Sequence, residues 1–322
     1  MLTSLALSLP LLASPAPDTI TLKPEQGLVL RKTFRREFEN EAEMSMEDST
    51  TTVSNAGRSV LIVVDTILGA DGDRVTKLER TYEEAGEERS YAFEGEWGAD
   101  SGEDTADCEL EDETVTFEWD EDEEAYEVSG DQDDDRLTDL RFDLDLVGFL
   151  PDGEVDEGDE WELEAEAFQE VVAFMDGVPL EWPSDDEGEA MEESEGPETD
   201  ERTDGEITLT YAGTRTIEGV ELAVIELEGE VETERTVDST QTFDEGSATI
   251  HREEFETREV EGVLLWDIEH GHAHSLEIEV EVEGESTDES TFEFDGQEFN
   301  HSSDQEMTGT VTFEATFERV ED

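Results

Sequence analysis

Three clustered histidines are the residues whose type and spacing come nearest to a metal site. His270, His272 and His274 form an HxHxH run. On a β strand this spacing would aim all three imidazoles at one face, where they could bind zinc or copper. The apolar pattern around them favours a hairpin whose turn contains two of the three. We therefore expect a solvated hairpin tip, with a metal site as the alternative.

Other chemistry-bearing patterns are weaker. Asp131, Asp133 and Asp135 alternate as in a calcium loop, but Arg136 stands where that loop needs glycine and Phe142 where it needs glutamate. Among 97 acidic residues, two carboxylates at glycosidase spacing are expected by chance. No nucleophile elbow, phosphate-binding loop, dinucleotide fingerprint or HExxH motif occurs. These absences predict a non-enzymatic protein without a cofactor, with a carboxylate-based hydrolase as the enzymatic alternative.

Cys108 is the only cysteine, so no intramolecular disulfide is possible. Its acidic neighbours favour the thiol over the thiolate, which argues against a reactive nucleophile.

Four apolar residues are candidates for a ligand-facing wall. Phe34, Phe38, Met44 and Met46 share one phase of an alternating segment. If the sheet curves around an apolar cavity, these side chains would line it. Otherwise they are ordinary core.

Period-two alternation is the dominant pattern of the chain and predicts the elements that must position these residues. From Leu276 to Glu283 every even position is apolar and every odd position is glutamate. A strand with this pattern buries one face and exposes the other. We expect a mainly β fold, namely a large curved antiparallel sheet or open barrel with long hairpins and two short helices mid-chain.

The alternation of apolar residues predicts which residues pair across the strands of two hairpins. A two-residue loop at Asp71–Gly72 would pair Leu78 with Asp65 and Tyr82 with Leu61. Near the C-terminus only an odd-length loop keeps both apolar sets on one face. The expected loop is His270–His272, and the expected pairs are Ile268 with His274, Trp266 with Leu276, and Leu264 with Ile278.

Composition shifts suggest how the chain is divided. Apolar residues at helical spacing predict short helices over about 137–150 and 165–175. Gly98–Asp112 resembles a loop, and Ser184–Gly205 is so acidic that we expect disorder. The expected order is a signal peptide (1–16), a β-rich first part (17–183), a disordered acidic loop (184–205) and long antiparallel strands (206–322) that complete the same domain.

The net charge of the chain limits which partners it can bind directly. Against 97 acidic residues stand 18 Lys and Arg, which gives a net charge of −79 and a pI near 4.1. Such a surface argues against nucleic acid or an anionic membrane as a direct partner. Only Lys23, Lys32 and Lys77 are lysines, a skew that suits high ionic strength. Weak association of divalent cations is expected at the acidic tracts.

The N-terminus predicts export. Leu2–Leu12 is apolar and is followed by the small residues Ala13–Ala16, as in a signal peptide, although no Lys or Arg precedes it. No apolar stretch reaches 18 residues, so we expect no transmembrane segment. The expected location is periplasmic or extracellular.

The segment Leu150–Trp161 is the most distinctive in the chain. It resembles the LPxGxVxxGDxW signature of uncharacterised exported β-rich bacterial proteins, and the later Gly219–Leu227 resembles a strand common in them. The resemblance implies no known activity. Physically it predicts a turn, in which Gly153 and Gly158 supply backbone freedom, Asp159 bonds nearby amides and Trp161 anchors the following element. The overall pattern is also loosely similar to envelope half-barrels that carry lipoproteins or lipids.

Three functions remain open from sequence. The first is a secreted or periplasmic non-enzymatic module that binds or carries an apolar ligand, or meets an envelope protein. The second is an acidic surface or structural protein adapted to salt. The third is the hydrolase named above.

Overall fold

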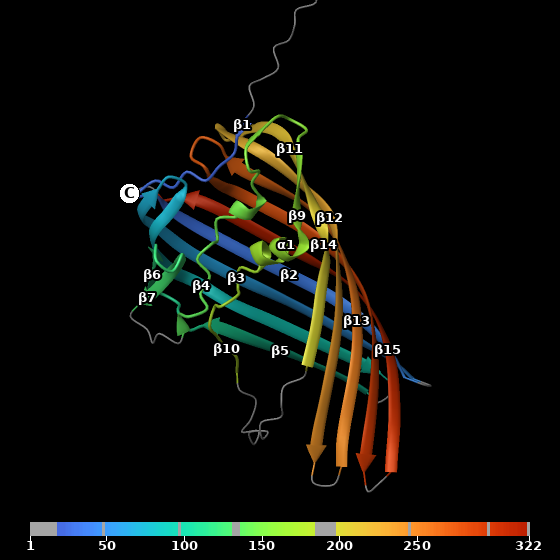
Figure 1. Ribbon diagram of the computed structural model, residues 1–322. Helices are drawn as coiled ribbons and strands as arrows, with labels where there is room; N and C mark the ends of the chain where they lie inside the picture. Colours follow the sequence, from blue (N-terminus) through green and yellow to red (C-terminus); the bar gives the residue numbers. More distant parts are fainter. Residues whose placement is uncertain are drawn as a thin grey trace, which may run out of the picture.

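The computed structural model describes residues 18–46, 49–95, 98–130, 136–183, 198–243, 246–294 and 297–320. The main element is a 13-stranded antiparallel sheet of long strands, which confirms the mainly β fold. The sheet is strongly curved and twisted (Figure 1). Helix α1 (Ala165–Val172) and the chain around it lie over one face, called here the covered face; the other is the open face.

The two halves of the chain meet in the middle of this sheet. Its order is β10-β5-β4-β3-β2-β15-β14-β13-β12-β11-β9, so the first long strand pairs with the last. On the β2 side of this junction lie β2 (Val29–Met46), β3 (Ser49–Asp71), β4 (Arg74–Gly95), β5 (Gly98–Cys108), β6 (Thr114–Asp120), β7 (Ala125–Gly130) and β10 (Leu180–Glu181). On the β15 side lie β15 (Gln297–Arg319), β14 (His272–Phe294), β13 (Gly246–Asp267), β12 (Val220–Phe243), β11 (Glu198–Ile217) and β9 (Glu160–Glu164). A separate pair joins β1 (Asp18–Thr19) to β8 (Glu154–Val155).

Alternation sorts the side chains between the two faces. On β14, Leu276, Ile278, Val280 and Val282 are at most 8% exposed, whereas the glutamates between them are exposed. The core therefore lies on the covered face. Burial of each such aliphatic side chain stabilises the fold by roughly 1.5–3 kcal/mol.

The hairpin between β3 and β4 turns one residue later than predicted. Its loop is Gly72–Asp73, since Asp71 pairs with Arg74. Leu78 therefore pairs with Ile67 rather than Asp65. Gly72 has a φ of +64°, the left-handed conformation that a tight turn requires. The alternation of apolar residues predicted correctly which side chains of β3 and β4 share a face. It did not predict which residues pair across the strands, because shifting one strand by two residues leaves the faces unchanged.

The hairpin between β13 and β14 also differs from the prediction. Leu264, not Trp266, pairs with Leu276, and Trp266 pairs with Ala273. The loop has an even number of residues, 268–271, and a bulge at His274 restores the phase. The prediction that the apolar residues of both strands share one face was right. The bulge, and not a three-residue loop, supplies the extra residue that brings them into phase.

The mid-chain helices are shorter than predicted. Residues 137–150 contain only the 3-10 turn η2 (Val147–Phe149) in place of the expected helix. The segment is irregular, and two bonds tie it to the sheet: the carboxylate of Asp145 accepts from Lys32, and the carbonyl of Arg141 accepts from Arg80. The second helix exists but ends at Val172, because the next residue, Ala173, leaves the helical conformation with a ψ of 54°.

Two predicted loops are strands. Gly98–Cys108 forms β5, and residues 198–205 are the first part of β11, paired along β12. The acidic composition led to a wrong prediction here, because pairing between strands satisfies the backbone hydrogen bonds whether or not the side chains are charged. The predicted signal peptide and residues 184–197 lie outside the described residues. Within the described residues, no helix has the length and apolar character needed to cross a membrane.

The turn predicted from the Leu150–Trp161 signature is present. Oδ2 of Asp159 accepts the amide of Asp156 at 2.8 Å, and Gly158 has a φ of +94°. The indole of Trp161 donates to the carbonyl of Phe149 at 3.2 Å. This turn leads through β9 directly into α1 and so fixes where the helix begins.

Candidate functional site

A groove of about 760 Å³ lies between helix α1 and the covered face of the sheet. This size falls within the range of small-molecule sites. Its apolar lining includes Phe38, Val280, Val311 and Phe313 from the sheet and Phe168 and Val172 from the helix. We call it the α1 groove.

Three arginines line the same groove in a chain with few cations. They are Arg36 of β2, Arg89 of β4 and Arg258 of β13. Glu87, buried beside them, accepts a hydrogen bond from Nε of Arg89 at 2.9 Å, and its Oε1 lies 3.8 Å from Nη2 of Arg36. Nε of Arg36 is buried and has no hydrogen-bond partner among the described residues. A buried donor without an acceptor costs about 1–3 kcal/mol, so the guanidinium of Arg36 is incompletely satisfied.

The position of α1 depends on Arg141. The last turn of the helix carries no basic residue of its own. Nη1 of Arg141 donates to the carbonyls of Glu170 and Ala173, the latter at 3.3 Å. A cation at these free carbonyls stabilises a helix C-terminus.

A buried ion cluster ties the segment around Arg141 to the sheet. Arg80 binds Asp65 through two hydrogen bonds of 2.7 and 2.8 Å and donates to the carbonyl of Arg141 at 2.7 Å. Lys32 bridges Asp65 at 2.8 Å and Asp145 at 2.6 Å. Lys32, Asp65 and Arg80 are each at most 2% exposed. The cluster thus joins β2, β3 and β4 to the segment that holds α1.

Charge pairing within the cluster outweighs burial. Burial alone would raise the pKa of Asp65, but Arg80 and Lys32 lower it to about 2. Burial would likewise lower the pKa of Lys32, yet Asp145 and Asp65 hold it above its usual value. Asp65, Lys32 and Arg80 therefore stay charged at neutral pH.

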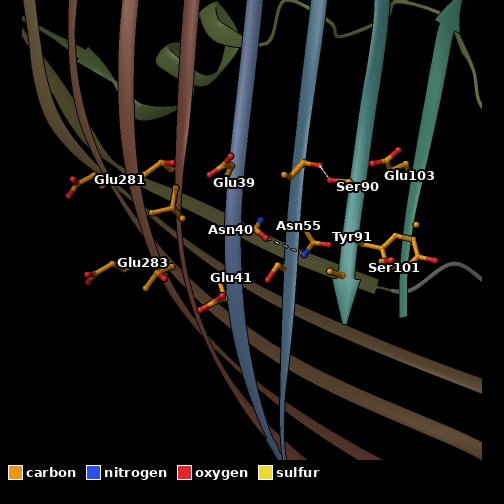
Figure 2. Close-up of a pocket in the computed structure, with 18 of the residues that line it drawn as sticks. Glu39, Asn40, Glu41, Asn55, Ser90, Tyr91, Ser101, Glu103, Glu281 and Glu283 are labelled. Atoms are coloured by element: carbon orange, nitrogen blue, oxygen red, sulfur yellow. Dashed lines mark hydrogen bonds between the residues drawn. The ribbon is translucent and has the colours of Figure 1, made fainter. Parts of the chain in front are cut away.

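The α1 groove adjoins a polar hollow of about 1060 Å³, shown in Figure 2. Asn40, Asn55 and Tyr91 line both. Nδ2 of Asn55 donates to Oδ1 of Asn40 at 3.1 Å, and carboxylates such as Glu39 and Glu103 lie around this pair. Apolar side chains predominate at the end beneath α1, where Phe168, Val172 and Phe313 line the groove.

Of the four predicted wall residues, the structure places one in the α1 groove. Phe38 lines it, and its ring lies over Gly57, where a Cβ would come within 2.4 Å. Phe34 is core instead, since it is 1% exposed and stacks on Phe174 at 5.5 Å. Met44 is half-buried near the far end of β2 and does not line the groove. The side chain of Met46 lies outside the described part.

The structure brings together two of the three predicted histidines and adds an aspartate. Nδ1 of His270 lies 2.7 Å from Oδ2 of Asp267. One potential ligand atom from each of Asp267, His270 and His272 lies within 4.8 Å of the others. His274 falls at the bulge of β14 and is not in this group. The predicted solvated tip is only partly right, because His272 is 4% exposed.

Burial and hydrogen bonding set the ionisation of this group. Burial lowers the pKa of His272. Burial would raise the pKa of Asp267, but hydrogen bonds from His270 outweigh it and lower the pKa. Elsewhere, burial raises the pKa of the Cys108 thiol, in keeping with an unreactive side chain. Asp131, Asp133 and Asp135 lie outside the described residues.

Sequence reasoning missed the arginines and the ion cluster, although a signal for both was present. Lys32 and Arg36 occupy the same phase of β2 as Phe34 and Phe38. Arg80 likewise shares the phase of Leu78. A charged residue in the apolar phase of a strand indicates a buried ion pair or a polar contact inside a site.

No family model and no curated protein sequence matches the chain. Among solved structures, OccK5 (OpdH) of Pseudomonas aeruginosa is 7% identical with a TM-score of 0.22, over 88% of this chain and 98% of its own. OccK7 (OpdD) of the same organism is 8% identical with a TM-score of 0.20, over 92% and 100%. The likeness to these outer-membrane porins is weak, and nothing about function follows from scores this low. The resemblance drawn from the turn signature stays a prediction.

Proposed function

We propose that this chain is an exported, non-enzymatic binding protein that holds an amphipathic ligand in the α1 groove. The observation that carries the proposal is an apolar groove of about 760 Å³ lined by Arg36, whose buried Nε has no hydrogen-bond partner among the described residues. Pockets of this size with a largely apolar lining and a few placed polar groups are typical ligand sites.

The polar groups favour a ligand with an anionic or hydrogen-bond-accepting head. Arg36, Arg89 and Arg258 line the groove. Glu87 accepts from Arg89 and Glu256 accepts from Arg258, so Arg36 is the cation with an unused donor among the described residues. Guanidinium binds carboxylate in a bidentate geometry, and the bond is stronger away from water. A long-chain carboxylate would place its chain against Val280 and Val311 and its head at Arg36.

The export part of the proposal rests on the apolar N-terminal stretch Leu2–Leu12. N-terminal sequencing of the mature protein tests it: cleavage near Ala13–Ala16 is expected, and an intact Met1 in an exporting host would contradict it.

Binding is tested with a neutral fluorescent probe, 1-N-phenylnaphthylamine, and dodecanoate as competitor. Val311→Trp fills the groove floor, since Val311 pairs with Val280 and Phe38. The matched control is Val263→Trp, at a position 37% exposed that does not line the groove. We expect wild type and the control to bind the probe alike and Val311→Trp to bind at least tenfold more weakly.

Arg36→Gln distinguishes the contribution of the ligand's carboxylate head group to binding from that of its apolar chain. We expect it to weaken competition by dodecanoate while leaving probe binding unchanged, because only the carboxylate needs the guanidinium. Equal probe binding by all variants, or none by wild type, would contradict the proposal.

A second function, adaptation to salt, is favoured by one feature of the open face. Glu164, Glu206, Glu230, Glu259 and Glu281 lie directly opposite one another across five adjacent strands. All five are exposed. Like charges directly opposite are destabilising in a sheet, and salt screens them. The two functions are compatible, because none of the five glutamates lines the α1 groove.

A further inference from the structure

One atom near the β13–β14 turn lacks a partner that its burial demands. Nε2 of His272 is buried and makes no hydrogen bond with any described residue. The residue as a whole is only 4% exposed. Leaving such an atom unsatisfied costs about 1–3 kcal/mol.

The other ring nitrogen of His272 fixes which form the ring takes. Nδ1 lies 2.7 Å from the carbonyl oxygen of Ala273, so it must carry the proton and donate. The lone pair is then on Nε2. Metal-binding histidines are usually oriented in this way, with one nitrogen donating to a carbonyl and the other free for the ion.

Two further residues offer potential ligand atoms close to the His272 ring. Asp267 is buried, its carboxylate accepts the amide of His270 at 2.9 Å, and Oδ2 contacts Nδ1 of that ring. The farthest two ligand atoms of the three residues are no more than 4.8 Å apart. Tetrahedral zinc needs about 3.3 Å between ligand atoms at its usual bond lengths of roughly 2.0–2.1 Å. Small side-chain rotations cover this difference.

The surroundings add two cations that an ion must tolerate. Nζ of Lys23 donates to the carbonyl of Ile268 at 2.6 Å, beside the turn. Arg319 also acts electrostatically on His272. The Asp267 carboxylate and the negative charge of the whole chain oppose them.

We propose that Asp267, His270 and His272 form a three-residue site for a divalent transition metal such as Zn²⁺, with a coordination position left for water or another ligand. Two imidazoles and one carboxylate suit zinc, copper or nickel better than calcium or magnesium. The site replaces the HxHxH arrangement by one in which Asp267 takes the place of His274.

The experiment is isothermal titration with Zn²⁺ in 1 M NaCl, where screening suppresses diffuse binding to carboxylates. Mg²⁺ serves as the control ion. The variants are His270→Ala, His272→Gln and His274→Ala. His270 is partly exposed, so its replacement should fold normally. The other two variants are first checked by circular dichroism.

We expect one Zn²⁺ per chain for wild type and for His274→Ala, and at least tenfold weaker binding for His270→Ala and His272→Gln. Zn²⁺ should also raise the melting temperature of wild type but not of His270→Ala. If His274→Ala weakened Zn²⁺ binding as much as the other two variants, all three histidines would bind the ion, and the proposal would be overturned. If all variants bound Zn²⁺ as the wild type does, the ion would be associating only with surface carboxylates, and this result too would overturn the proposal.

Discussion

Neutralising the middle of the glutamate row should stabilise the protein, and the gain should fade with salt. Glu259 faces Glu230 on one side and Glu281 on the other. Neighbouring strands lie about 4.8 Å apart, and exposed carboxylates splay to about 6 Å. In water each pair then repels by about 0.7 kcal/mol before screening.

Screening sets the size of the effect at each salt concentration. With a Debye length of about 10 Å at 0.1 M, each pair retains about 0.4 kcal/mol, and with about 3 Å at 1 M it retains about 0.1 kcal/mol. Glu259→Gln removes two pairs. We expect it to raise the free energy of unfolding by about 0.8 kcal/mol at 0.1 M NaCl and by about 0.2 kcal/mol at 1 M.

The assay is urea unfolding at both salt concentrations, because guanidinium is itself a salt. The matched control is Glu226→Gln, an exposed glutamate on the open face whose cross-strand neighbours are Thr210 and Val263. This control corrects for the loss of one charge from a chain of net charge −79. If Glu259→Gln gains no more than the control, or gains equally in 1 M salt, the reasoning is refuted.

Two further variants test how the covered segment is held. Asp65→Asn should lower the free energy of unfolding by about 3–5 kcal/mol at pH 7, because it removes the buried carboxylate that pairs with both Lys32 and Arg80. Since folding lowers the pKa of Asp65 from 3.8 to about 2, its contribution is full above pH 3.8 and is lost as the pH falls towards 2. The deficit measured by urea unfolding should therefore shrink by about 2 kcal/mol over that window, and a constant deficit would contradict the charge pairing. Gly177→Ala should cost at least about 2 kcal/mol, because its Cβ would lie 1.7 Å from a carbonyl oxygen and φ is +75°. Gly153→Ala, with nothing within 4 Å, should be nearly neutral in thermal melts, and equal effects would refute the role of that contact.

The face of each strand could be predicted from sequence, and its partner only in part. Alternation in Leu276–Glu283 predicted both the sheet and its buried face, because a strand has a period of two. It could not distinguish pairings that differ by two residues, as at Leu78, nor foresee the bulge at His274. Acidity suggested loops at Gly98–Asp112 and 198–205, where strand pairing prevailed.

The candidate site was predictable to a lesser degree. Phe38 was found because it continues an apolar phase, whereas Arg36 in that same phase was passed over. The contribution of Asp267 could not be inferred from spacing, because it depends on how the turn after β13 folds back. The irregular path of residues 137–146 likewise depends on long-range bonds to Lys32 and Arg80.

The most direct test of the central claim is a crystal structure with a long-chain carboxylate that carries bromine at its chain end. Ligand binding in the α1 groove predicts an anomalous bromine peak against Val280 and Val311 and carboxylate density at Arg36. A groove filled by protein side chains, or bromine bound only elsewhere, would contradict the account.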